Sequence, residues 1–281
     1  MRHLLTSAAL VAAATAVQAD GHAGIVGYAL ANNGQTLVTM GSIAAPGDVE
    51  TVSLSMALSA IAYRPVTGDL LGISEGKVVI IDPSSGEITD LMAEFADDAM
   101  LGAGAVAFDF NNAIDAVRAV SATGANLVYF PEGFGDGDDR AGSVLRFTDA
   151  FYAEGDANAG RAPSIFANAY TNAVAGMTAS ATAQYALDSE TDALVTLANN
   201  AGELGTVGAV TVGGMGVDLA ASGGFDIVSP EEGTDLAFAI LQMEGAETAG
   251  LYSIDLGTGA ATLLADLGMG NFSGFAISLG M

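Results

Sequence analysis

The sequence predicts an all-β fold built from repeats of one small pleated unit. Residues 250–264, GLYSIDLGTGAATLL, alternate apolar and polar side chains and then reach Gly259, which accepts the left-handed backbone of a tight turn. The same frame recurs at residues 79–91 and 185–197. Aligning these three copies places one acidic residue in a shared column, namely Asp82, Asp188 and Asp255.

The spacing of the repeats suits a closed ring. With weaker copies around Met40 and Phe130, the anchors lie at 40, 81, 130, 187 and 254, in steps of 41, 49, 57 and 67 residues. A four-stranded propeller blade takes roughly 40–50 residues. Residues 272–279, FSGFAISL, resemble the first strand of the unit with nothing after it, and the N-terminus supplies the missing rest. We therefore expect a single β-propeller with five blades, or alternatively six, closed by pairing of the C-terminal strand with the N-terminal blade.

The expected units follow one another without a linker rich in Pro or Ser. We expect one domain, residues 20–281, with β units at 24–54, 56–91, 105–147, 164–210 and 212–267. Residues 92–104 are the one segment with helical spacing of apolar side chains, so a short helix is expected there, with a loop as the alternative.

The N-terminus predicts export. Residues 1–19 have the pattern of a signal peptide: Arg2, then the apolar run LLTSAALVAAATAV, then a small-x-small cleavage site at Val17-Gln18-Ala19. We expect the mature protein in the periplasm or outside the cell. No later run of 18 or more apolar residues occurs, so we expect no membrane insertion.

The strongly negative net charge argues against nucleic acid and anionic lipid as partners. The chain carries 33 acidic and 7 basic residues, for a net charge of −26. Such a chain lacks the basic footprint that nucleic acid or anionic lipid requires. We expect a monomer whose partner is a small molecule, a glycan or a protein.

Composition also excludes several kinds of catalytic site. There is no Cys, and the two histidines, His3 and His22, lie at the N-terminus, so Ser-His-Asp, Cys-His and His-rich metal sites are excluded. We find no phosphate loop and no dinucleotide-binding motif, and we expect no cofactor other than a possible Ca²⁺. Paired carboxylates in a propeller channel could still hydrolyse glycans, which is the alternative function.

Two stretches contain candidate site residues. Glu132, Asp136, Asp138 and Asp139 form a flexible acidic loop that could hold Ca²⁺, although the sequence favours a solvated acidic loop, because no Glu closes the twelve-residue calcium-loop spacing. The second stretch, DFNNAIDAVRAVS at residues 109–121, offers a ligand-binding set: Asp109, Asn111, Asp115 and Arg118. Arg118 lies on a predicted strand and needs a partner, for which Asp109 or Asp115 is the expected residue, either as an ion pair between blades or at a ligand.

These residues also carry a family resemblance. The segment from Asp109 to Gly133, the AYTN at 169–172 and the LYSIDLGTGAATLL at 251–264 resemble the DUF4394 family of uncharacterised exported bacterial proteins. This chain has Asn112 where the family pattern DFNP has proline. The resemblance implies a propeller-like fold and no particular activity. We therefore predict an exported, non-enzymatic binding or scaffolding protein.

Overall fold

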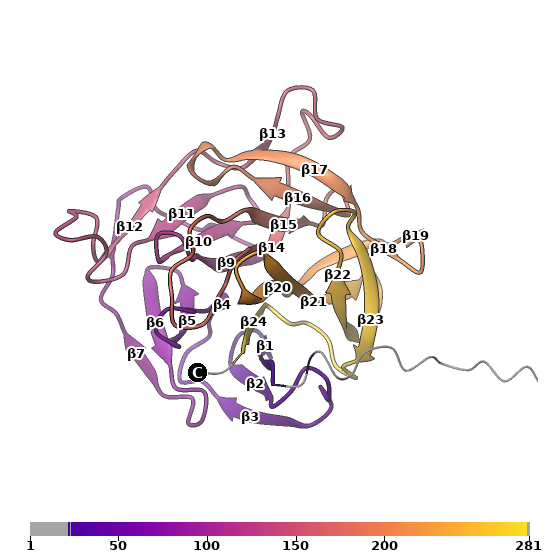
Figure 1. The fold of residues 1–281 in the computed structure, drawn as a ribbon, viewed down its shortest axis with the longest axis horizontal. Helices are drawn as coiled ribbons and strands as arrows, with labels where there is room; N and C mark the ends of the chain where they lie inside the picture. Colours follow the sequence, from indigo (N-terminus) through magenta and orange to yellow (C-terminus); the bar gives the residue numbers. More distant parts are fainter. Residues whose placement is uncertain (1–21, 23, 280–281) are drawn as a thin grey trace, which may run out of the picture.

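The computed structural model describes residues 22 and 24–279, which form five β-sheets arranged around a central axis (Figure 1). The innermost strands of the sheets contact one another in the cyclic order β24, β4, β9, β14, β20. Each sheet extends outward from its innermost strand as one blade. The predicted five-bladed propeller is confirmed, whereas the predicted signal peptide, residues 1–19, lies outside the described residues.

The first blade joins the two ends of the chain. From the axis outward it consists of β24 (Gly274–Ser278), β1 (Val26–Ala31), β2 (Thr36–Met40) and β3 (Val49–Ser53). The pairing of β24 with β1 is antiparallel and runs from Val26 opposite Ser278 to Leu30 opposite Gly274. The predicted closure by the C-terminal strand is therefore confirmed.

The other four blades follow in chain order, each given from the axis outward. The second has β4 (Ala60–Tyr63), β5 (Leu70–Ser74), β6 (Lys77–Ile81) and β7 (Ile88–Asp90). The third has β9 (Val106–Asn111), β10 (Ala116–Ser121), β11 (Asn126–Tyr129), β12 (Ser143–Arg146) and β8 (Glu94–Phe95). The fourth has β14 (Ile165–Tyr170), β15 (Gln184–Asp188), β16 (Ala193–Leu197), β17 (Glu203–Ala209) and β13 (Phe151–Tyr152). The fifth has β20 (Leu219–Glu231), β21 (Thr234–Met243), β22 (Ala249–Ile254), β23 (Ala260–Asp266), β18 (Thr211–Val212) and β19 (Met215–Gly216).

Side-chain capping explains why the aspartate column marks turns. Asp82 Oδ1 accepts the backbone N–H of Ser84 at 2.8 Å, which fixes the turn that follows β6. Asp255 Oδ1 accepts the N–H of Gly257 and the hydroxyl of Thr258, both at 2.9 Å. Such short-range bonds select a turn from local sequence alone.

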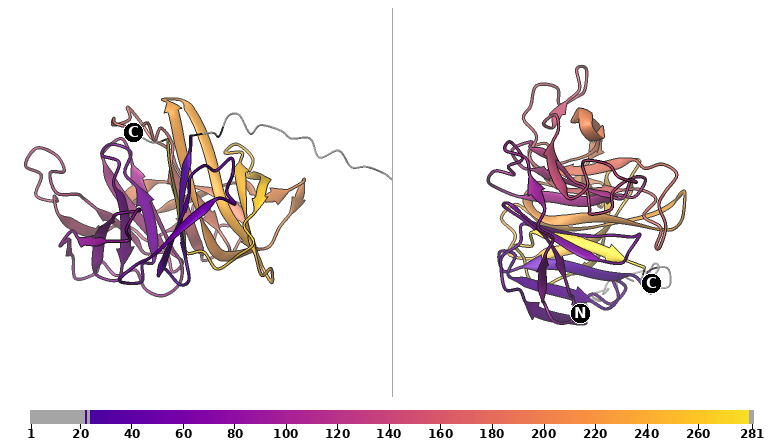
Figure 2. Two further views of the ribbon diagram at one scale, coloured as in Figure 1. Left: turned by 90° about the horizontal axis from the view of Figure 1, so that it is seen from below. Right: turned by 90° about the vertical axis from the view of Figure 1, so that its left-hand side faces the viewer.

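Apolar side chains fill the space between neighbouring blades. Phe108 and Phe110 of β9 pack with Leu71 and Ile73 of the second blade. Each large buried side chain of this kind contributes about 1.5–3 kcal/mol by leaving water. The blades are thus joined mainly by apolar contacts, and the long β20–β21 hairpin extends beyond the rest of the ring (Figure 2).

Close backbone approach seals the ring near its axis. A Cβ atom on Gly224 of β20 would lie 2.4 Å from the backbone nitrogen of Phe275 in β24. Real Cβ atoms do not tolerate such a contact, so only glycine fits where these two strands meet. The approach of Gly274 to β4 is close but less strict, because its Cβ would lie 3.1 Å from the nitrogen of Ile61.

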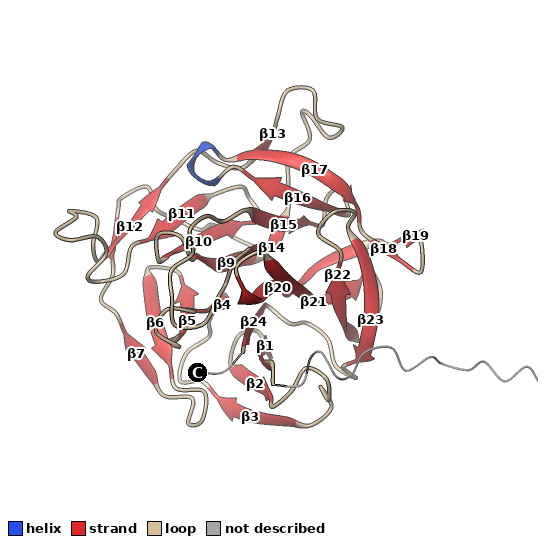
Figure 3. Ribbon diagram, viewed as in Figure 1, coloured by secondary structure: helices blue, strands red, loops and turns tan. Residues whose placement is uncertain are grey.

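The predicted helix at 92–104 is wrong. Met92 has a left-handed φ of 54°, and Glu94–Phe95 form β8, which pairs in parallel with β12 at the edge of the third blade. Although its apolar side chains have helical spacing, the segment forms an edge strand because its backbone pairs with β12. Within the described residues, the one helical element is a 3₁₀ turn, η1 (Asn199–Ala201), drawn in blue in Figure 3.

One column of the repeat alignment is also wrong. Leu187 lies in β15, the second strand of its blade, whereas Ile81 and Ile254 lie in the third strand of theirs. Asp188 nevertheless caps its turn as its column mates do, accepting the N–H of Glu190 at 2.9 Å. Equivalent turn chemistry at a different position in the blade produced the misalignment.

Candidate functional site

The axis of the ring opens into a pocket where the innermost strands begin. The space available to a water-sized sphere there is about 280 Å³. Its ten lining residues come from the first, fourth and fifth blades and from the segment that enters the third: Asn33, Gly104, Ala105, Phe166, Ala221, Ser222, Gly223, Asn271, Phe272 and Ser273. We call this space the axial pocket.

Two β-bulges contribute to the axial pocket. In β14 the register shifts between Ile165 and Ala167, and the residue between them is Phe166, which lines the pocket. In β20 the register shifts between Leu219 and Gly223, and Ala221 and Ser222 from this irregular stretch line the same pocket. β14 and β20 are neighbours in the ring. Bulges of this kind re-aim side chains and occur preferentially beside functional sites.

Backbone crowding fixes the second bulge. A Cβ atom on Gly223 would lie 1.9 Å from the carbonyl oxygen of Ile240, and its φ of 134° suits glycine. Its N–H donates to the carbonyl of Phe272 at 2.8 Å, which ties β20 to the segment that enters β24. The hydroxyl of Ser222 donates to the same carbonyl at 3.0 Å. One main-chain and one side-chain hydrogen bond to the same carbonyl thus hold this wall of the axial pocket.

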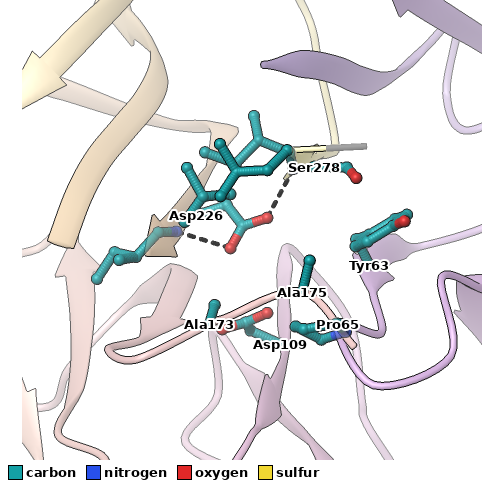
Figure 4. Close-up of a pocket in the computed structure, with 11 residues that line it drawn as sticks. Tyr63, Pro65, Asp109, Ala173, Ala175, Asp226 and Ser278 are labelled. Carbon is teal, nitrogen blue, oxygen red and sulfur yellow. Dashed lines mark hydrogen bonds between the residues drawn. The ribbon is translucent and has the colours of Figure 1, made fainter. Parts of the chain in front are cut away.

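A pair of buried carboxyl groups lies at the other end of the axis, where the innermost strands end. Asp109 of β9 and Asp226 of β20 are each 5% exposed and line one small cavity (Figure 4). Asp109 Oδ2 accepts the N–H of Tyr170 at 2.7 Å. Asp226 accepts the N–H of Ile227 at Oδ1 and that of Ile277 at Oδ2, each at 2.7 Å. The pair thereby links the third blade to the fourth and the fifth blade to the first.

Burial raises the pKa of both carboxyl groups. Burial raises the pKa of Asp226 to about 7, against which its two backbone hydrogen bonds act. Burial also raises the pKa of Asp109 well above its usual range, and the nearby Asp226 carboxylate raises it further. Two carboxyl groups in one dry cavity do not both ionise readily. We therefore expect the pair to hold at least one proton at neutral pH.

A loop covers this end of the axis. Residues 171–183, between β14 and β15, place Ala173 and Ala175 against the carboxyl cavity. The loop bonds to three other blades: Gly176 N–H to the Pro65 carbonyl at 2.8 Å, Ala179 N–H to the Asn112 carbonyl at 3.0 Å, and Ser229 N–H to the Ala173 carbonyl at 3.2 Å. It is therefore anchored across the end of the ring.

The carboxyl pair has the raised pKa that an acid catalyst needs but not the space for a substrate. The cavity gives a water-sized sphere about 10 Å³, close to the minimum for one water molecule. Three of the four oxygens of the pair already accept backbone N–H groups. A glycosidase needs both carboxyl groups to reach a sugar and an attacking water. This geometry does not favour the hydrolase alternative.

The residues of the predicted ligand-binding set do not gather at one site, and each makes its own contacts within the protein. Asp115 pairs with Arg64 of the second blade, through Nε at 2.8 Å and through Nη2. Asn111 Oδ1 accepts the N–H of Ala113 at 3.1 Å and the hydroxyl of Thr182 at 2.9 Å, which secures both its own turn and the 171–183 loop. Asp109 is the one member of the set that lines a cavity.

Arg118 does not pair with Asp109 or Asp115, contrary to the expectation. Its Nε donates to the Tyr170 hydroxyl at 2.9 Å, its Nη2 to Asn200 Oδ1 at 2.7 Å, and its Nη1 to Asn126 Oδ1. Asp115 is taken by Arg64, and Asp109 bonds the backbone of Tyr170. Arg118 is 3% exposed, so this contact between the third and fourth blades buries a charge among neutral acceptors.

The proposed calcium ligands remain on an exposed loop. Asp138 is bound by the backbone and the side chain of Arg140, with Nε at 2.9 Å, and these bonds lower the pKa of Asp138 to about 2. Among the residues that the structure describes, no three His, Cys, Asp or Glu side chains gather as metal ligands.

Sequence reasoning missed Asp226 and the whole axial pocket. A signal for Asp226 was present, because the Phe-Asp pair at 108–109 recurs at 225–226 in the corresponding strand of another blade. Gly223-Gly224 beside it marked a close backbone approach. Nothing in the local sequence identified Phe166 as a bulge residue.

Comparison with known protein families places the chain in one of them. The family model DUF4394, described as a domain of unknown function, matches residues 36–276. A search of curated proteins finds no match. No helical segment among the described residues has the length and apolarity needed to cross a membrane.

Several solved structures resemble this one. A protein of unknown function from Bacteroides thetaiotaomicron is 13% identical, with a TM-score of 0.44 over 89% of this chain, which spans 58% of its length. The nidogen/laminin complex is 11% identical, with a TM-score of 0.46 over 90% of this chain and 97% of that one. A gluconolactonase of Xanthomonas campestris is 13% identical, with a TM-score of 0.44 over 89% of this chain and 76% of that one. Scores this low carry no argument about function.

Proposed function

We propose, for a chain that belongs to the DUF4394 family, that it is an exported, non-enzymatic binding protein whose ligand occupies the axial pocket. The observation that carries this proposal is the pair of bulges, in β14 and β20, that open onto one mouth of the ring. Regular strands would bury their side chains between blades. Bulges occur preferentially beside functional sites, so two of them around one space support a binding site there.

The character of the pocket supports binding rather than catalysis. Its lining holds no Asp, Glu, Lys, Arg or His, and its two serine hydroxyls have no basic side chain among the lining residues to activate them. The carboxyl pair, which could do acid–base chemistry, lies at the opposite end beneath the 171–183 loop. The pocket therefore supplies contact surface and hydrogen-bonding groups without a catalytic group.

A blocked pocket tests the proposal. Ala221 is exposed on the pocket wall, so Ala221→Trp fills the mouth. We expect a thermal-shift screen of the mature protein with small metabolites and glycans to find ligands that raise the unfolding midpoint, because they bind only the folded state. We expect Ala221→Trp to abolish those shifts.

Ala141→Trp is the matched control, since Ala141 is an exposed alanine on the loop between β11 and β12. It should retain every shift. Ligand shifts that survive Ala221→Trp unchanged would place binding elsewhere and contradict the proposal.

A further inference from the structure

The polar groups of the axial pocket indicate which kind of molecule fits it. Asn33 and Asn271 bring carboxamides to the mouth, and Ser222 and Ser273 are the hydroxyl-bearing residues of the lining. None of the ten lining residues is charged, in a chain with 33 acidic residues. An ionic ligand would lose its hydration there and meet no counter-charge. A neutral ligand meets no such penalty.

Backbone geometry holds the two carboxamides in place. Asn33 lies in the turn between β1 and β2 with a φ of 54°, and Asn271 enters β24 with a φ of 58°. The N–H of Asn271 donates to Gln242 Oε1 at 2.8 Å, while Gln242 Nε2 donates to the Ala246 carbonyl at 2.7 Å. The buried amide of Gln242 thus positions Asn271 and is itself fully oriented.

Both carboxamides are available to a ligand. Within the described part of the chain, neither side-chain amide makes a hydrogen bond to another protein group. A carboxamide donates through its NH₂ and accepts through its oxygen. A hydroxyl group does the same, so hydroxyls are complementary to both ends of each amide.

Part of the pocket lining is apolar. Ala105 and Ala221 line the pocket together with Phe166 and Phe272, whose rings are 2% exposed and back this lining from the hydrophobic core. A ligand seated there needs an apolar face as well as polar groups at its edge. Ring compounds with hydroxyl groups around a C–H framework have both.

We propose that the axial pocket binds a neutral, hydroxyl-bearing ring compound of monosaccharide size, oriented by the carboxamides of Asn33 and Asn271. This inference rests on the proposed function and names its ligand class. The 171–183 loop covers the far end of the axis, so the ligand enters and leaves through one mouth.

Calorimetric titration of the mature protein tests the inference with four probes of similar ring size: glucose, myo-inositol, glucuronate and glucosamine. We expect the two neutral compounds to bind and the two charged ones not to bind. Asn33→Gly and Asn271→Gly remove the amide while glycine keeps the left-handed backbone without strain. Each variant should weaken binding about tenfold, the effect of one lost hydrogen bond to the ligand.

Asn32→Gly is the matched control. Asn32 neighbours Asn33 in the same turn with a φ of 52°, is exposed, and does not line the pocket. The Asn32→Gly variant should bind glucose and myo-inositol with the same affinities as the wild type. Equal binding of charged and neutral rings, no binding of the neutral rings, or full affinity in Asn33→Gly and Asn271→Gly would overturn the ligand class while leaving a pocket ligand of another kind. Ligand shifts indifferent to Ala221→Trp would instead overturn the proposed function.

Discussion

The buried carboxyl pair predicts an unusual pH dependence, and Asp109→Asn is the perturbation that exposes it. The asparagine oxygen can still accept the N–H of Tyr170, which Asp109 Oδ2 now accepts at 2.7 Å. The other carboxyl oxygen of Asp109, in the cavity shared with Asp226, becomes an NH₂ group, which is a hydrogen-bond donor and carries no charge (Figure 4). The substitution therefore removes the repulsion and keeps the bond between the third and fourth blades.

The pKa of Asp226 gives the scale of the effect for one carboxyl group of the pair. Burial raises it from 3.8 to about 7, and each unit corresponds to about 1.4 kcal/mol, so this group alone costs about 4 kcal/mol above pH 7. The folded state keeps a proton that the unfolded chain releases. The free energy of unfolding is therefore unaffected by this group below about pH 3.8, falls as the pH rises, and levels off above about pH 7.

Asp109→Asn should reduce the pH dependence of stability without abolishing it, because it removes the titration of Asp109, whose pKa burial and the Asp226 carboxylate raise, while burial still raises the pKa of Asp226. We expect the variant and the wild type to unfold with similar free energies near pH 4. Near pH 8 we expect the variant to be more stable by about 3 kcal/mol, within the several kcal/mol that one buried ion costs.

Urea unfolding at a series of pH values from about 4 to about 8 measures the effect, with the free energy taken from the midpoint and slope. Asp97→Asn, at an exposed aspartate of the segment between β8 and β9, is the control for a simple loss of one negative charge. The reasoning fails if wild-type stability does not fall between about pH 5 and 8. It fails equally if Asp109→Asn parallels the wild type at every pH.

Three further predictions concern the ring itself. Gly224→Ala should lower the free energy of unfolding by about 3 kcal/mol or more in urea, since its Cβ would lie 2.4 Å from the Phe275 nitrogen; an unchanged midpoint would mean that β20 and β24 can separate freely. Arg118→Met should lower the free energy of unfolding by about 2 kcal/mol or more, because the buried acceptors around it, including the Tyr170 hydroxyl, lose their donor. A stabilised variant would show that the desolvation of the guanidinium outweighs its hydrogen bonds. Deleting residues 272–281 leaves the edge of β1 unpaired, so size-exclusion chromatography should show aggregates or no folded monomer; a stable monomer would contradict closure as a source of stability.

Local rules predicted much of the fold. The Asp-x-x-Ser/Thr turns cap themselves through bonds two and three residues away, so they can be read without knowing the tertiary structure. Alternation of apolar and polar side chains predicted the strands, and the unfinished final unit predicted closure. The same rules misjudged residues 92–104 and placed Leu187 one strand out, because local patterns do not state which strand a segment will pair with.

The candidate site depended on contacts that no local rule contains. The sequence alone predicted a closed all-β ring of five, or alternatively six, blades, since each repeat encodes its own turns and strands. Only the tertiary structure brought Asp109 and Asp226 into one cavity, because β9 and β20 meet at the axis only when the ring closes. Only the tertiary structure, likewise, brought the Arg118 guanidinium within hydrogen-bonding distance of the Tyr170 hydroxyl and placed the bulges of β14 and β20 beside each other. These features arise where backbones from distant repeats converge, and the available space there is fixed by the whole ring.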